Sequence, residues 1–265
     1  MAPRLSALWM LSSLAAWAAA PAITMTAPSD GYLTYVGTAS AQHSAKVLYR
    51  EHHVLRIRDG RIAERVVLYT CSDGAAAFAR KEVWYVDPTA PDFALEDPSN
   101  GMREGIRSSS SGRVVFFASH TEAEKIAALP RVAGLVADAG FDEFVRMHWD
   151  DLMAGRSLAL RFLVPSRLAD FAFRVQHLRA DRIDGAPVEV FRLKLAGIRG
   201  WIIPGIDVFY GTGDRTLRRY EGLSDLRDAA NDNFQTQIDF PTGERRRSDA
   251  EALRRVRQVP LAPCT

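Results

Sequence analysis

Six histidines and two cysteines are the side chains of this sequence best suited to bind a metal. The histidines are His43, His52, His53, His120, His148 and His177. His52 and His53 are neighbours in a strand-like run, where they must point to opposite faces and cannot hold one metal together. The spacings typical of zinc sites, such as HxH, HExxH or a Cys-His cluster, do not occur. We therefore predict neither a metal site nor a cofactor.

No specific sequence pattern marks a catalytic nucleophile or an acid–base pair either. No GxSxG turn surrounds a serine, and the run Ser108 to Ser111 lies in a glycine-containing stretch typical of a loop. Asp150 and Asp151 are adjacent on an expected helix, where successive side chains point about 100° apart. Glu96 and Asp97 are likewise sequence neighbours. The sequence thus predicts no catalytic residue, although carboxylates brought together by the fold would allow a hydrolase.

A stronger signal for binding comes from large apolar groups beside turns. Residues 87–112 are rich in Pro, Gly and Ser and are expected to form a long loop, the kind of segment that often carries function. Residues 197–206 are apolar and bounded by glycines, which fits a buried connection or, alternatively, the rim of an apolar cavity. Arg103 in the first segment could anchor a polar group. The candidate ligand-binding residues are Phe93, Arg103, Trp149, Trp201, Ile202 and Phe209.

Strands must position these residues, because alternating and β-branched runs fill both halves of the chain. Asp59-Gly60 and Asp184-Gly185 separate strand-like runs and predict hairpins, since both central positions of a type I′ turn need positive φ. Helices are expected at 121–129 and 141–154. A third should begin at a capping box formed by Ser248 and Glu251.

Composition indicates an ordinary globular protein. The 265 residues are 47% hydrophobic and 25% charged, and the net charge is +2. Such a small charge gives no basic field to attract nucleic acid, so no nucleic-acid partner is expected.

The first residues have the three parts of a secretory signal. Arg4 provides positive charge, an apolar run follows to Ala16, and small residues then offer a cleavage site. An uncleaved anchor is the alternative, but the run is shorter than the roughly 20 residues of a spanning helix. We predict export to the periplasm and no transmembrane segment after cleavage. The expected organisation is a signal peptide at 1–18, a flexible arm at 19–31, one β-rich domain at 32–241 and a C-terminal helix and tail at 242–265.

Cys71 and Cys264 are the two cysteines. An even number in an oxidising compartment allows one disulfide, which would tie down the end of the chain. The alternative is a pair of free thiols.

The second half resembles the half-barrel proteins of the lipoprotein-carrier (LolA/LolB-like) superfamily. The likeness is carried by Ile206 to Tyr210, a Gly turn, Leu217 to Gly222 and Gln237 to Phe240, and the run Tyr220 to Asp228 resembles uncharacterised exported proteins of Gram-negative envelopes. This resemblance implies an α+β fold with a curved, mainly antiparallel sheet, a few helices packed on it, and an apolar cavity. It transfers no catalytic residue.

Three functions fit these features. The first is a periplasmic, non-enzymatic binding or carrier protein for a lipid, acyl or lipoprotein-like ligand. The second is an envelope scaffold that contacts a protein partner. The third is a hydrolase of an envelope polymer. A carrier predicts an apolar cavity, a scaffold a filled core with an exposed apolar patch, and a hydrolase a polar cleft with convergent titratable groups.

Overall fold

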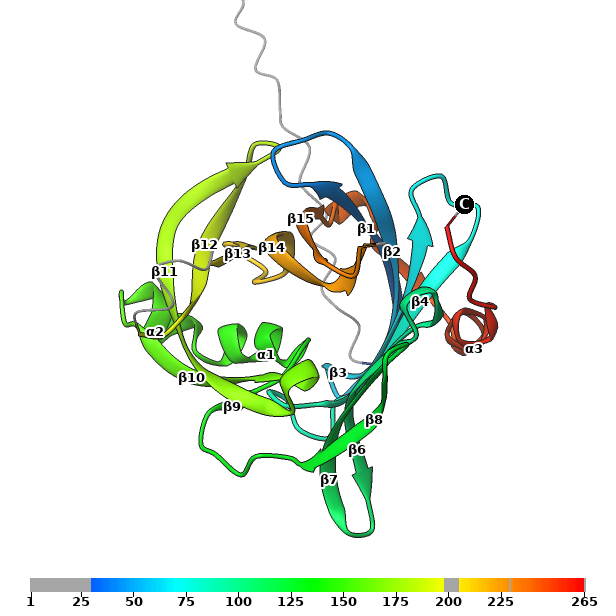
Figure 1. Ribbon diagram of the computed structural model, residues 1–265. Helices are drawn as coiled ribbons and strands as arrows, with labels where there is room; N and C mark the ends of the chain where they lie inside the picture. The colour runs from blue at the N-terminus through cyan, green and yellow to red at the C-terminus, as the bar shows by residue number, and fades with distance from the viewer. Residues whose placement is uncertain (1–29, 198–204, 229, 265) are drawn as a thin grey trace, which may run out of the picture.

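One long curved sheet contains the sixteen strands of the described residues (Figure 1). The structure is a computed structural model that describes residues 30–197, 205–228 and 230–264. Along the sheet the strands follow the order β8-β7-β6-β5-β4-β3-β2-β1-β15-β14-β13-β12-β11-β10-β9, and β16 pairs with β1. Neighbouring strands of this sheet are antiparallel, apart from β9 and β10. The predicted fold class, a curved antiparallel half-barrel with a few helices, is confirmed.

The strands of the first half are β1 (Gly31–Ala41), β2 (Val47–Arg58), β3 (Arg61–Cys71), β4 (Ala77–Trp84), β5 (Asp92–Asp97), β6 (Met102–Ser109), β7 (Gly112–Ser119) and β8 (Glu122–Ala128). Those of the second half are β9 (Leu135–Val136), β10 (Leu158–Val164), β11 (Ala169–Ile183), β12 (Ala186–Leu195), β13 (Ile206–Gly211), β14 (Leu217–Arg227), β15 (Asn233–Asp239) and β16 (Arg246–Ser248). The α-helices are α1 (Gly140–Met147), α2 (Trp149–Met153) and α3 (Ala250–Gln258).

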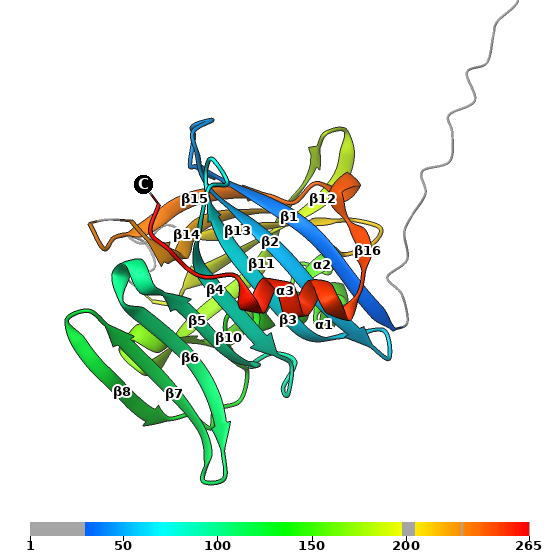
Figure 2. The same ribbon diagram turned by 90° about the vertical axis from the view of Figure 1, so that its right-hand side faces the viewer.

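Helices cover the two faces of the sheet differently. The α1 helix lies within the curve of the sheet, where Phe144 and Val145 pack against inward side chains of β10 to β13 (Figure 1). The α3 helix lies across the outer face of β2 to β4 (Figure 2), and Leu253 packs there on Val54 and Val66. Both faces of β3 are therefore buried in its second half, which explains the apolar run from Val66 to Tyr69.

Both predicted hairpins are present. Asp59 and Gly60 have φ of 50° and 70° between β2 and β3, and Asp184 and Gly185 have φ of 49° and 79° between β11 and β12. The helical prediction for 141–154 is also largely confirmed, although the helix is interrupted at His148 and forms α1 and α2.

The helix predicted at 121–129 is wrong, because this segment is strand β8. Its residues pair with β7, with Phe116 opposite Ile126 and Val114 opposite Ala128. The Glu, Ala and Lys side chains that favour a helix are mostly exposed here, so pairing with the neighbouring strand overrides their local preference.

The long loop predicted at 87–112 is also wrong, since this segment contains all of β5 and β6. Gly101 makes the turn between them, at a φ of 56°. Gly105 lies inside β6, where a Cβ atom would come within 1.8 Å of the Phe93 carbonyl oxygen. This glycine permits a close approach of two strands and does not mark a loop.

The start of the C-terminal helix differs by one residue from the prediction. Asp249 is the N-cap of α3, and its side chain accepts a hydrogen bond from the Ala252 amide at 2.9 Å. Ser248 instead belongs to β16, where it pairs with Tyr32. The predicted signal peptide and nearly all of the predicted arm lie outside the described residues.

A disulfide joins Cys71, at the end of β3, to Cys264, near the end of the chain. The tail between α3 and Cys264 runs beside β4, where the Ala262 amide donates to the Ala77 carbonyl at 2.8 Å. In the part of the chain that the structure describes, none of the helices is long and apolar enough to cross a membrane.

Candidate functional site

A cavity of about 210 Å³ lies on the inner side of the sheet. Its walls come from β1 to β4 on one side and from β10 and β12 to β14 on the other, and α1 contributes Phe141. The apolar part of the wall includes Val67, Phe141, Phe162, Leu193, Ile206 and Val208. Segments distant in sequence therefore meet around one mainly apolar space.

Lys81 introduces a charge into this cavity from β4. Its Nζ atom donates to Asp138 Oδ2 at 2.5 Å and to Asp225 Oδ2 at 2.7 Å. The Lys81 and Asp138 side chains are buried, whereas that of Asp225 is 51% exposed. Burial alone would lower the pKa of Lys81, but the two carboxylates hold it well above its ordinary value. Lys81 is therefore charged and ion-paired, and so is not a free base.

Glu104 lies on β6, two strands away from Lys81 on β4, and the two residues are aligned across the sheet through Leu95 of β5. Lys81 is opposite Leu95, and Leu95 is opposite Glu104. Burial, together with the negative charge of Asp225, raises the pKa of Glu104 to about 8. The side chain is thus neutral in the folded protein at pH 7, while it ionises in the unfolded chain.

This difference predicts a pH-dependent effect of Glu104→Gln. Because the folded-state pKa is raised, the unfolded chain releases the proton first, and wild-type stability falls as pH rises from about 4.5 to 8. Glutamine cannot ionise, so the stability of the variant does not fall with this titration. From pH 5 to pH 8.5, we expect the unfolding free energy of the variant to rise by about 2–5 kcal/mol relative to that of wild type. Urea unfolding at both pH values measures this gain.

The control for that experiment is Glu122→Gln on the exposed strand β8. It should shift stability equally at both pH values. An identical pH dependence in Glu104→Gln and wild type would contradict the buried, neutral state of Glu104.

Aromatic and basic groups form another part of the cavity lining. The ring of His53 stacks on that of Tyr35, with centroids 4.4 Å apart, and its Nε2 atom lies 2.9 Å from Glu51 Oε2. Arg65 Nη2 donates to Asp142 Oδ2 at 3.4 Å. The cavity therefore combines an apolar wall with enclosed polar groups.

Two of the sequence-predicted ligand residues lie near this cavity without lining it. Trp149, on α2, is buried and packs edge-on against Phe191 and Tyr210 behind the cavity wall. Phe209, on β13, is buried with Val188 and Val190 in a separate cluster. Its neighbour Val208 points inward instead, because successive strand residues face opposite sides.

The remaining candidates are dispersed. Phe93 is buried in the cluster of β4 to β7 with Val83 and Ile106. The Arg103 side chain is 58% exposed and lies 4.0 Å from Glu124. Trp201 and Ile202 lie outside the described residues. The structure thus does not bring the four described candidates together in one site.

The charged residues of the cavity were missed by sequence reasoning. Lys81 stands in the run Arg80-Lys81-Glu82, which is typical of a solvated strand. Ala79 and Val83 lie two residues before and after Lys81, and both are fully buried. Because residues two apart in a strand face the same side, this spacing places Lys81 on the inner face.

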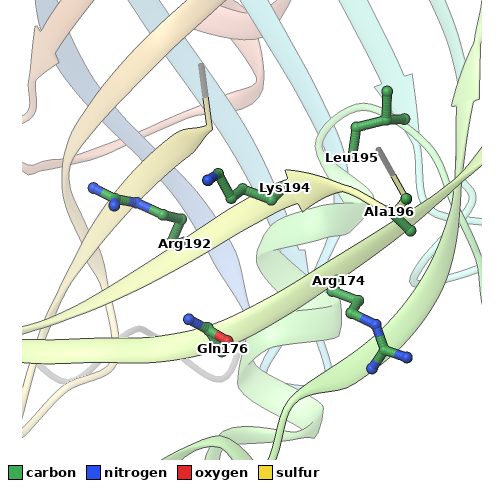
Figure 3. Close-up of a pocket in the computed structure, with 7 residues that line it drawn as sticks. Arg174, Gln176, Arg192, Lys194, Leu195 and Ala196 are labelled. Atoms are coloured by element: carbon green, nitrogen blue, oxygen red, sulfur yellow. The ribbon is translucent and has the colours of Figure 1, made fainter. Parts of the chain in front are cut away.

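A second hollow, of about 300 Å³, lies on the outer face of the sheet (Figure 3). Arg174 and Gln176 of β11 and Arg192 and Lys194 of β12 line it. Arg174 is opposite Lys194 in the strand pairing, and Arg192 is bound at 2.6 Å to Asp207. All of its lining comes from two adjacent strands and the residues directly after β12, so it is a hollow on a single stretch of the sheet.

Comparison with known proteins gives likenesses of fold. No family model and no curated protein matches the sequence. A beta-barrel-like protein of the domain of unknown function DUF1849 from Brucella abortus is 9% identical, with a TM-score of 0.39, over 83% of this chain and 98% of that one. A putative outer membrane lipoprotein-sorting protein domain from Vibrio parahaemolyticus is 8% identical, with a TM-score of 0.30, over 83% and 86%.

A LolA superfamily protein from Nitrosomonas europaea is 11% identical, with a TM-score of 0.24, over 85% of this chain and 89% of that one. The sequence of the second half likewise resembles the LolA/LolB-like superfamily, and both likenesses concern the fold alone. At this level of similarity, any functional argument rests on the residues of the chain itself.

Proposed function

We propose that this protein is a periplasmic, non-enzymatic binding or carrier protein that holds a lipid-like or acyl ligand inside the half-barrel. The observation that carries this proposal is the inner cavity, where an apolar wall from β10, β12 and β13 faces buried aromatic and charged side chains. Ligand sites are typically concave and apolar with a small number of placed polar groups.

The size of the cavity limits what it would hold. Its volume of about 210 Å³ is smaller than the roughly 300–1,000 Å³ of sites for drug-sized ligands. One acyl chain, or the end of a longer one, therefore suits it better than several lipid tails. Each buried methylene would contribute about 0.8 kcal/mol.

The disulfide supports the proposed compartment. Such bonds form and persist in oxidising environments such as the periplasm. The signal-like segment at residues 1–18 favours the same location.

The ion pairs of Lys81 argue against the hydrolase alternative. Asp138 and Asp225 converge on this lysine, which keeps its proton in their company and so cannot act as a general base.

Filling the cavity should remove the ligand. Ile206 lines the cavity from β13, so Ile206→Trp would occupy the space of an acyl chain. We expect the fraction of protein that carries a co-purified amphiphile to fall at least tenfold, which corresponds to about 1.4 kcal/mol of lost affinity. Native mass spectrometry followed by solvent extraction measures this fraction.

Ile126→Trp is the matched control, since Ile126 is exposed on β8, away from the cavity. It should retain the ligand at the wild-type level. Equal ligand content in the two variants, or wild-type protein that repeatedly contains no ligand, would count against the proposal.

A further inference from the structure

Buried nitrogen atoms that lack hydrogen-bond partners lie at one end of the cavity and directly beside it. Among the described residues, these atoms include His53 Nδ1, Arg65 Nε and Arg245 Nε. His53 and Arg65 line the cavity and are 5% and 7% exposed. Buried polar atoms are rarely left unpaired, and several together call for an unseen partner.

Stacked rings connect these groups. Tyr35 lies in the cavity wall with His53 parallel to its ring, at 4.4 Å and 11°. The Arg245 guanidinium lies 4.5 Å from the centre of the same Tyr35 ring, and its Nη2 atom donates to the Leu217 carbonyl at 3.2 Å. Leu217 also lines the cavity. The arginine is thus held against two residues of the wall.

The carboxylates nearby are already engaged. Glu51 is bound to His53. Asp142 accepts from Arg65 and from the Tyr210 hydroxyl, the latter at 2.7 Å. Within the described residues, Arg245 has no carboxylate within 4.0 Å. Among the described residues, this end of the cavity therefore leaves two arginine donors, Arg65 Nε and Arg245 Nε, without an acceptor.

We propose that this end of the cavity binds the anionic head group, a carboxylate or phosphate, of an amphiphile whose chain lies along Phe162, Leu193 and Ile206. Arginine N–H groups form strong, charge-assisted hydrogen bonds to such oxyanions. With Nε2–H donating to Glu51, the Nδ1 atom of His53 is an acceptor and can bind a hydroxyl of the head group, such as that of a monoprotonated phosphate. This inference rests on the proposed function and names its ligand class.

Short amphiphiles with equal chains test the head-group preference by isothermal titration calorimetry. The probes are octanoic acid, octyl phosphate, 1-octanol and inorganic phosphate. We expect at least one octyl anion to bind tenfold or more tightly than 1-octanol, and more tightly than inorganic phosphate.

Three other results have distinct meanings. Equal affinity for the anions and 1-octanol would overturn the anionic subsite and leave the proposed function standing. No binding of any octyl compound would contradict the proposed function itself. Inorganic phosphate that binds as tightly as octyl phosphate would indicate a free-anion site and overturn the amphiphile assignment.

Arg245→Gln tests the contribution of the arginine without leaving a carboxylate unpaired. It should weaken binding of the octyl anions about tenfold and leave that of 1-octanol unchanged. Arg247→Gln, at an exposed position of β16, is the matched control and should change neither. Unchanged anion affinity in a folded Arg245→Gln protein would overturn the assignment of Arg245, while the wild-type comparison of head groups stays valid if the variant fails to fold.

Discussion

Replacing Cys71 and Cys264 with alanine is expected to lower the free energy of unfolding by about 5 kcal/mol. The disulfide links residues 193 positions apart, so its loss frees most of the chain in the unfolded state. Because whole proteins of this kind are stable by only about 5–15 kcal/mol, this change would remove a large share of the total. Urea unfolding of the double variant beside oxidised wild type measures it.

A local effect should accompany the global one. The tail contacts β4 through Ala262 and through Arg80, whose Nη1 atom donates to the Arg257 and Val259 carbonyls. We expect faster amide exchange at Ala262 in the variant, because the anchor at Cys264 is gone. Wild type under reducing conditions is the control and should lose the same stability. An unchanged unfolding midpoint, with loss of the bridge verified by mass, would contradict the expected role of the disulfide.

Lys81→Met should have the second largest effect, a loss of about 3–5 kcal/mol of stability. Methionine retains much of the apolar stem of lysine but removes the charge that compensates Asp138 and Asp225. Asp138 is buried, and nearby Glu104 would become still harder to ionise. Thermal and urea unfolding measure the loss.

Lys125→Met provides the matched control for this variant. Lys125 pairs with Glu122 at 3.0 Å on the exposed strand β8, and surface pairs of this kind contribute about 0–1 kcal/mol. Adding Asp138→Asn to Lys81→Met should restore part of the stability, because it removes the uncompensated buried charge. A loss in Lys81→Met no larger than that in Lys125→Met would show that the buried ion pairs contribute little.

Local sequence signals predicted the hairpins because their cause is local. Asp59-Gly60 and Asp184-Gly185 adopt the positive φ values that their turns require, whatever the rest of the chain does. The opposite holds for β8, where the residues favour a helix and only the partner strand β7 makes them extended. Gly105 was misread for a similar reason, since the close carbonyl of Phe93 comes from another strand.

The sequence resemblance implied an apolar cavity, but it did not predict which residues line that cavity. Its charged groups meet across long stretches of chain, with Lys81 lying 57 residues from Asp138 and 144 from Asp225. Contacts between residues so far apart in the chain leave no short sequence motif. The face that a strand residue occupies also decides its role: Val208 lines the cavity, while the predicted Phe209 points away from it.

The most direct test of ligand binding inside the half-barrel is photo-crosslinking with an octanoic acid that carries a diazirine at the end of its chain, followed by mass-spectrometric mapping of the labelled peptides. Binding in the inner cavity predicts label on the peptides that contain Phe162, Leu193 and Ile206, and its loss in Ile206→Trp. Label concentrated at exposed apolar positions such as Val86 and Met147, and unchanged in Ile206→Trp, would contradict it.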